Sequence, residues 1–463
     1  MKKQIKCLCV AALLGLSPAI FADSSAAIQY FQDKEAARQL PEAYMAYKNK
    51  DYGKALEIYK HFADQGNAVG QYMMGYLYQN GYGVSKDSML ASAWYIKANG
   101  QGLPEAQFAL GMMYYYGVSV SQGVSQAEQL FNQAALHENA QAQYMLGYMY
   151  SMGYGVTKDL KMAMDWYTQA ATKGVMQAQY NLGLIYYSQK DYSKAYNWFS
   201  LASQQGLAKA QFMVGLMYSL GQGIATDKNQ AFYWYTQAAQ KGLDVAEYNL
   251  GIDYYNGVGT PPNLVPAVNW IGKAAAQGYA RAQYFMGYLS YNGIGVPKDP
   301  AKSLEWYMKS AEQNFAEAQF AVGYLYHNGF VVAKDDRQAL SWYVAAAKQG
   351  SQNAQYMAGL FYQKGMGVPS DQRMAAYWYS QAAGQGMDNA QLLLGTMYAQ
   401  GEGLAKDDKL AYAWLNLAST SSNTQVREAA IRLRDELAKN MSPADVNAAK
   451  QLSQGFYSKY ATQ

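Results

Sequence analysis

A glycine recurs through this sequence at a nearly constant interval, and no other feature constrains the fold as strongly. Successive copies are 36 residues apart, except for one gap of 32 residues. A fixed period of this length is typical of a solenoid, in which one supersecondary unit stacks on copies of itself. The repeats, and not the length of 463 residues, therefore define the units of the chain. The recurring glycines are Gly75, Gly111, Gly147, Gly183, Gly215, Gly251, Gly287, Gly323, Gly359 and Gly395.

The one short gap reveals a second form of the repeat. After Gly183 the chain continues "YYSQKDYSKAYNW", in which a glycine-rich loop is deleted. Counting back 32 residues from Gly75 reaches Ala43, and the segment "AYKNKDYGKALEIY" just after it has the same shortened form. Counting the full and the shortened copies together predicts eleven helix pairs.

Each full copy has the pattern of two helices joined by a glycine-rich loop. In the copy that starts at Ala142, apolar residues recur at helical spacing up to Tyr150 and form one stripe. The recurring Gly147 lies inside this helix, although glycine there costs roughly 1 kcal/mol relative to alanine. We therefore expect the partner helix to cross too closely for a side chain. The loop "GYGV" that follows has glycines suited to positive φ.

The second helix of each pair has regular start and stop signals. Asp, Asn and Gly are typical of helix N-caps, and Gly or Asn commonly ends a helix in the left-handed conformation. The predicted N-caps are Asp51, Asp87, Gly123, Asp159, Asp191, Asp227, Asn263, Asp299, Asp335, Asp371 and Asp407. The predicted stops are Gly66, Gly102, Gly174, Gly206, Gly242, Gly278, Asn314, Gly350 and Gly386.

All nine tryptophans occupy one position of the second helix. A row of aromatic residues at one repeat position is typical of core packing, so we expect each tryptophan to pack between its own helix pair and the next pair. The second full copy lacks both the Gly-x-Gly sequence and the tryptophan, which predicts a distorted loop around 117–123. The tryptophans are Trp94, Trp166, Trp198, Trp234, Trp270, Trp306, Trp342, Trp378 and Trp414.

The segment "AQYMLGYMYSMGYGVTKDLKMAMDWYTQAATKG" resembles the Sel-like repeat (SLR) family, relatives of the tetratricopeptide repeats. The resemblance covers roughly Pro41 to Ser419, and the two shortened copies look more like plain tetratricopeptide units. It implies an all-α fold: a right-handed superhelical solenoid of about eleven antiparallel helix pairs. After residue 419 the pattern stops, and 420–463 is predicted to form two polar capping helices, the second starting at Ser442-Pro443.

The N-terminus has the pattern of a secretory signal peptide. Lys2, Lys3 and Lys6 precede a mainly apolar run that ends before Ala22, which predicts cleavage after residue 22 and leaves 23–40 as a lead-in. A retained membrane anchor is the alternative, although the run is short for a bilayer span. Removal of 1–22 takes three positive charges from a net charge of +4, which makes the mature chain nearly neutral and unlike a nucleic-acid-binding protein. We therefore expect a periplasmic or secreted protein.

Signals of catalysis are weak in this sequence. His61, His137 and His327 occupy three different repeat positions and are not expected to converge on a metal ion. The motifs of zinc proteases, serine hydrolases and nucleotide-binding loops are absent from the sequence. The only cysteines, Cys7 and Cys9, lie in the predicted signal peptide, so the mature chain would have no thiol chemistry. We therefore predict a protein that is not an enzyme and has no cofactor and no catalytic or metal-binding residue.

The resemblance implies a protein–protein interaction scaffold, which acts in envelope regulation or in bacteria–host interaction and virulence. Tyrosines on the first helices support a recognition surface, because tyrosine gives large contact area at low entropic cost. Two alternatives remain: a module that binds glycan or peptidoglycan, and a cell-wall-related hydrolase. The hydrolase-like members resemble a cysteine-rich branch of the family, which this chain does not match. The tyrosines are Tyr76, Tyr148, Tyr288 and Tyr324, one step after the glycine, and Tyr115, Tyr187, Tyr255 and Tyr291, four steps after it.

The inner face of the middle repeats is the predicted partner-binding site. The deleted loop near Gly183 should alter the stacking there, and the first helices that follow carry residues that packing does not require. Arg and Tyr are typical anchors of protein interfaces, and Asn can bond an extended backbone. Asp253 is the most irregular member, because its position is apolar in other repeats; it marks either a pocket or a locally exposed site. The predicted set is Asn181, Tyr187, Asn249, Asp253, Tyr255 and Arg281.

Overall fold

A computed structural model describes residues 34–460, and this part of the chain consists of helices without strands. The chain divides after Asp227 into two compact units, which we call the N-terminal unit and the C-terminal unit. The predicted signal peptide, 1–22, and the first part of the predicted lead-in lie outside the described residues. The first described helix begins at Lys34 and continues through Pro41.

The N-terminal unit contains eleven described helices of similar length. They are α3 (Lys34–Lys48), α4 (Tyr52–Asp64), α5 (Ala68–Asn80), α6 (Ser88–Asn99), α7 (Pro104–Tyr116), α8 (Val124–Leu136), α9 (Ala140–Met152), α10 (Leu160–Thr172), α11 (Met176–Ser188), α12 (Tyr192–Gln204) and α13 (Ala208–Leu220).

The C-terminal unit contains thirteen described helices. They are α14 (Lys228–Gln240), α15 (Asp244–Asn256), α16 (Leu264–Ala276), α17 (Ala280–Asn292), α18 (Pro300–Glu312), α19 (Ala316–Asn328), α20 (Asp336–Lys348), α21 (Gln352–Lys364), α22 (Gln372–Gly384), α23 (Asp388–Gln400), α24 (Asp408–Ala418), α25 (Thr424–Ala438) and α26 (Pro443–Tyr460).

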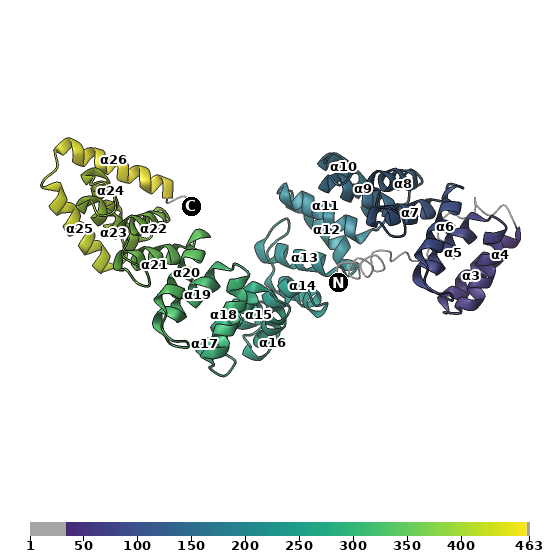
Figure 1. The fold of residues 1–463 in the computed structure, drawn as a ribbon, viewed down its shortest axis with the longest axis horizontal. Coiled ribbons are helices and arrows are strands. Elements are labelled where there is room, and N and C mark those ends of the chain that lie inside the picture. The colour runs from purple at the N-terminus through teal and green to yellow at the C-terminus, as the bar shows by residue number, and fades with distance from the viewer. Residues whose placement is uncertain (1–33, 461–463) are drawn as a thin grey trace. The chain divides into compact units, whose positions relative to one another are not determined.

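The predicted fold class is confirmed: consecutive helices form pairs, from α3 with α4 to α11 with α12 in the N-terminal unit and from α15 with α16 to α23 with α24 in the C-terminal unit, and α25 and α26 follow them. Within each unit successive pairs stack on one another (Figure 1). Helices α25 and α26 both pack on α24, and the rings of Trp414 and Phe456 stack at 4.6 Å between centroids. The Oγ of Ser442 accepts a hydrogen bond from the backbone N–H of Asp445 at 3.1 Å, as expected of the cap of α26.

The predicted caps and turns explain why the helices begin and end where they do. The Oδ1 of Asp159 accepts a hydrogen bond from the N–H of Met162 at the start of α10, at 3.0 Å. Gly153 ends α9 in the left-handed conformation with φ of 71°, and Asn314 takes the same conformation after α18 with φ of 62°. These local signals fix the helix boundaries before any tertiary contact is considered.

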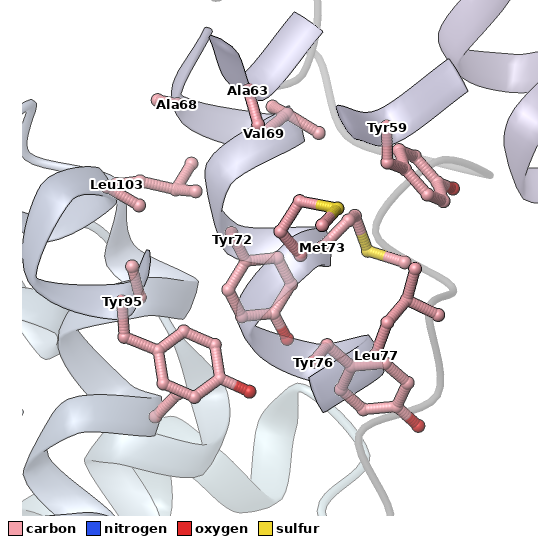
Figure 2. Packing of buried hydrophobic residues seen from close by; sticks show 14 of the residues in the cluster. Tyr59, Ala63, Ala68, Val69, Tyr72, Met73, Tyr76, Leu77, Tyr95 and Leu103 are labelled. Atoms are coloured by element: carbon pink, nitrogen blue, oxygen red, sulfur yellow. The ribbon is translucent and has the colours of Figure 1, made fainter. Parts of the chain in front are cut away.

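The recurring glycine is where the two helices of a pair come closest. A Cβ added to Gly147 would lie 2.6 Å from Cδ1 of Tyr167, which is fully buried in α10. The same close approach joins Gly75 to Tyr95 and Gly323 to Tyr343. Figure 2 shows the Tyr95 ring beside Tyr72 of the first helix, with 5.7 Å between the centroids. The expectation of a close helix crossing at the glycine is confirmed.

In the second helix of a pair, the residue directly after the tryptophan is more deeply buried than the tryptophan itself. Tyr167 is fully buried, whereas Trp166 is only half-buried. Trp166 packs on the cluster that contains Phe131 of α8 and Leu146 of α9. The expectation that the tryptophan packs toward the next pair was wrong, because its side chain contacts its own first helix and the preceding pair. Only Trp378 and Trp414 are buried.

The loop of the second full copy is not distorted. Ser119 takes the place of the missing glycine and adopts a φ of 59°, within the left-handed region. The N–H of Gly123 still bonds the carbonyl oxygen of Tyr114, as Asp87 bonds Tyr78 in the preceding copy. The predicted distortion was wrong because one strained serine keeps the backbone path that the glycine would allow without strain.

A row of buried glutamines ties three consecutive helices together in most repeats. The Nε2 of Gln319 in α19 donates to the carbonyl oxygen of Ala311, near the end of α18, at 3.2 Å. The Oε1 of the same residue accepts from Nε2 of Gln349, just beyond α20, at 2.7 Å. Because a buried amide is stable only when it is hydrogen-bonded, these bonds fix the spacing of neighbouring pairs. The glutamines that donate in this way are Gln71, Gln143, Gln179, Gln211, Gln283, Gln319, Gln355 and Gln391.

The close approach predicts that glycine-to-alanine changes have opposite effects at two helical positions. Gly147→Ala should lower the free energy of unfolding by roughly 1 to 3 kcal/mol, because the new methyl group overlaps the Tyr167 ring. Gly272→Ala in α16 should raise it by up to about 1 kcal/mol, because nothing lies within 4 Å of its Cβ position. Urea unfolding followed by circular dichroism measures both changes. Equal destabilisation by the two variants would contradict the close-crossing explanation.

Candidate functional site

The tyrosines that were expected to form a recognition surface differ widely in exposure. Tyr76 is buried and its hydroxyl lies 3.3 Å from that of Tyr47, so it belongs to internal packing. Tyr148 and all four tyrosines at the later position are half-buried. Tyr288 and Tyr324, at the same position of α17 and α19, are 37% and 43% exposed. Two of the eight tyrosines, both in the C-terminal unit, are therefore exposed, and their role in recognition stays a prediction.

These two tyrosines belong to a larger set of aromatic side chains, which we call the aromatic row: Tyr255, Phe285, Tyr288, Tyr324 and Phe330. The ring of Phe285 contacts Tyr255 edge-on, with 5.3 Å between centroids, and lies 5.6 Å from Tyr288. One repeat later the ring of Tyr324 lies 6.2 Å from that of Phe330, which is 59% exposed. Exposed aromatic side chains at one position of consecutive repeats form a hydrophobic surface that no described residue covers.

Asparagine side chains accompany the exposed tyrosines. Nδ2 of Asn292 donates to the carbonyl oxygen of Tyr288 at 2.9 Å, and Nδ2 of Asn328 donates to that of Tyr324 at 2.8 Å. Each amide keeps a second N–H and an oxygen that no other described residue bonds. The first helices α17 and α19 thus present aromatic rings beside neutral amides.

The predicted site residues fall in both units. Asn181 and Tyr187 lie on α11 of the N-terminal unit, where each makes an internal hydrogen bond. Nδ2 of Asn181 donates to the Tyr167 hydroxyl at 3.2 Å, and the Tyr187 hydroxyl donates to Oε1 of Gln222 at 2.7 Å. Both side chains therefore serve packing within this unit, and their role in binding stays a prediction.

The other four predicted residues lie on α15 and α17 of the C-terminal unit. Tyr255 is part of the aromatic row. Nδ2 of Asn249 donates to the carbonyl oxygen of Val245 at 2.7 Å, within its own helix. Arg281 is exposed, and its charge opposes the burial that raises the pKa of Tyr248. Their part in partner binding also stays a prediction.

Asp253 is half-buried and is not the locally exposed residue that one interpretation expected. Its Oδ2 is buried and has no hydrogen-bond partner in the described part of the chain. Burial raises the pKa of the Asp253 carboxyl to about 7, although Lys228 partly opposes the shift. The equivalent residues Leu289 and Leu325 are buried apolar side chains, which explains the cost of a charge at this position.

A second buried acid on the same helix was missed by the sequence reasoning. Glu247 is 4% exposed and replaces the glutamine of the other repeats. Its Oε2 accepts from Nε2 of Gln277 at 2.7 Å, but a carboxylate has no N–H to donate. Burial raises the pKa of Glu247, against the effects of Gln277 and Lys273. The break in an otherwise constant glutamine position was the available signal.

The described residues offer few other sites for chemistry. No group of three or more His, Cys, Asp or Glu side chains within 34–460 is arranged to hold a metal ion. In the same part of the chain, no helix combines the length and the apolar character needed to cross a membrane. Nδ1 of His327 lies 2.6 Å from Oδ1 of Asp336, a pairing that the sequence reasoning did not foresee.

The raised pKa of Asp253 predicts that stability falls as the pH rises. The protonated side chain is favoured in the folded state, so its contribution is complete below about pH 4 and is lost as the pH rises through about 7. Asp253→Asn should therefore raise the free energy of unfolding at pH 8 by on the order of 1 to 2 kcal/mol, allowing for partial solvent screening. Urea unfolding between pH 4 and pH 8.5 measures the effect. Glu305→Gln, which removes an exposed acid of α18, is the control and should leave the pH profile unchanged.

Comparison with known proteins identifies the repeat. Ten segments match the Sel1 repeat: 68–103, 104–139, 140–175, 177–207, 208–243, 244–279, 280–315, 316–351, 352–387 and 388–423. A protective antigen of uropathogenic Escherichia coli strains, with an SLR fold, is 31% identical over 94% of this chain and 95% of that chain, with a TM-score of 0.78. A Sel1 repeat protein from Oxalobacter formigenes is 34% identical over 51% of this chain and 98% of its own length, with a TM-score of 0.48. None of the curated proteins matches this chain. The chain belongs to the Sel1 repeat family.

Proposed function

We propose that this protein is an exported scaffold that binds an extended segment of a partner protein along the aromatic row. The Sel1 fold is in general a non-catalytic protein-interaction scaffold, which supports binding as the activity. The observation that carries the proposal is the exposure of Tyr288, Tyr324 and Phe330 on consecutive repeats of one unit. Natural interfaces concentrate their binding energy in such aromatic side chains.

The chemistry beside the row favours a peptide backbone as the ligand. Asn292 and Asn328 are neutral, and each carries a donor and an acceptor for a main chain laid across the rings. Arg281 is the one charged residue of α17, the helix that carries Tyr288, and its side chain is exposed. A surface of this composition suits a partner segment with apolar side chains and little net charge.

The site of action is also a proposal. The basic and apolar N-terminus supports export to the periplasm or beyond, and the similarity to a protective antigen of uropathogenic strains supports a role in the envelope or at the host interface. Cell fractionation together with N-terminal sequencing of the mature chain tests this. A chain that keeps residues 1–22 in the cytoplasm would contradict it.

Removal of the exposed rings should weaken partner binding without unfolding the protein. A peptide ligand is first selected from a displayed random library on the full chain, and its Kd is measured by fluorescence anisotropy. The triple variant Tyr288→Ala, Tyr324→Ala, Phe330→Ala should bind this peptide at least about tenfold more weakly, because aromatic hot spots contribute more than 1 kcal/mol each.

The matched control is the double variant Tyr233→Ala, Tyr377→Ala. Both tyrosines are 51% exposed but lie on the second helices α14 and α22, outside the row. The control should bind normally and keep the helical signal. Equal weakening in both variants would contradict the proposal. The glycan-binding alternative would be supported instead if no peptide were selected and if the protein bound oligosaccharides on an array in a way that the triple variant abolished.

A further inference from the structure

A cavity of about 730 Å³ runs along one side of α20, away from the residues of the aromatic row. One face of this helix supplies Arg337, Leu340, Ser341, Val344 and Lys348, which follow each other at helical spacing. On the opposite side lie Tyr362 of α21 and Val368 of the loop that follows it. We call this feature the α20 groove. Its centre is apolar, and a basic side chain stands at each end.

The two basic residues are a departure from the repeat pattern. Arg337 lies 14 residues and Lys348 lies 25 residues after the recurring Gly323. No other full copy has a basic residue at both positions. The corresponding pairs are Met89 and Gly100, Ser125 and Leu136, Lys161 and Thr172, Asn229 and Gln240, Val265 and Ala276, Ala301 and Glu312, Arg373 and Gly384, and Lys409 and Thr420.

The next repeat places a second arginine beside the groove, together with the N-cap Asp371. Arg373 occupies the Arg337 position on α22, and it lines an adjoining cavity that shares Tyr362 and Val368 with the groove. In a solenoid, residues at one position of consecutive repeats are neighbours. Arg337 and Arg373 therefore mark one end of the groove, and Lys348 marks the other.

The acids near these cations are engaged elsewhere. The Oδ1 of Asp335 accepts hydrogen bonds from the backbone N–H groups of Arg337 and Gln338, and Asp336 pairs with His327 and Lys334. Oδ1 of Asp371 likewise accepts from the backbone of Arg373. None of the ion pairs within residues 34–460 contains Arg337, Lys348 or Arg373, and all three side chains are exposed.

We propose that the α20 groove binds an extended acidic peptide segment whose carboxylates are four residues apart, on one face of the segment. Eleven helical residues separate Arg337 from Lys348, which corresponds to about 16 Å along the axis. One small anion cannot bridge that distance, whereas four residues of extended chain span about 13 Å with both carboxylates on the same face, and the flexible Arg and Lys side chains cover the remaining distance. The apolar centre at Leu340, Val344 and Val368 suits peptide side chains between the two carboxylates.

Labelled peptides of seven residues test the proposal on the full chain by fluorescence anisotropy. The probe has Glu at positions 1 and 5 with Val and Thr between, and the comparison peptides have Glu at positions 1 and 3, or Gln in place of both Glu. The 1,5 peptide should bind most tightly, and its affinity should fall with added salt. Arg337→Ala with Lys348→Ala should weaken its binding about tenfold or more, because two charge-assisted bonds are lost.

Charge reversal gives a second readout that a structural defect would not reproduce. Arg337→Glu with Lys348→Glu should reject the acidic probe and bind a peptide with Lys at positions 1 and 5. The control, Lys161→Ala with Lys302→Ala, removes two exposed positive charges outside the groove and should bind the acidic probe normally. The aromatic-row triple variant should also bind it normally, which separates this proposal from the proposed function.

Four outcomes would overturn the proposal. The first is that the 1,3 peptide binds as tightly as the probe, and the second is that inorganic phosphate at the same total charge displaces the probe. The third is that an acidic oligosaccharide such as oligogalacturonate binds more tightly than the probe. The fourth is that the control variant weakens probe binding as much as the Arg337 and Lys348 variant does. The first two would indicate a site for a single anion, the third a site for glycan, and the fourth a non-specific charge effect.

Discussion

The contact between a helical glycine and the residue twenty positions later is the constraint on which the rest of the structure depends. It places the ring of Tyr167 against the bare backbone of Gly147, and the same pairing recurs with Tyr, Phe, Ile or Leu as the partner. A Cβ at the glycine would force the helices apart, so the pair could no longer bury that side chain. Because the pairs stack on one another, a change in one crossing would also shift the surface offered to the next.

The glutamine hydrogen bonds between helix pairs are the second constraint on how the pairs stack, and this constraint is altered at α15. Gln319 donates to one helix and accepts from another, whereas Glu247 can only accept unless it is protonated. Asp253 adds a buried carboxyl to the same helix, in a position that is otherwise apolar. The free energy of this repeat is therefore more sensitive to pH than that of its neighbours, since both carboxyl groups have a raised pKa.

Binding surfaces arise at positions that the repeat does not need for packing. The residue types at Gly287 and Tyr307 are constrained by the close contact of the two helices, whereas the side chain of Tyr288 lies outside that contact and is exposed. The same reasoning applies to α20, where the buried Tyr343 faces the core and Arg337 and Lys348 lie on another side of the helix. One stack of helices can in this way present an aromatic row from its first helices and a basic groove from a second helix.

The sequence by itself determined the number of helix pairs, their boundaries and their turns, because caps such as Asp159 and left-handed residues such as Gly153 act through local backbone bonds. It also located the close crossing, since only a steric demand explains a glycine at the same position of ten first helices. Exposure was decided by the tertiary structure alone. Tyr76 and Tyr288 share one repeat position, yet Tyr47 packs on the first and leaves it 8% exposed, whereas the second is 37% exposed. The division after Asp227 likewise has no sequence signal, because the period of 36 residues continues across it.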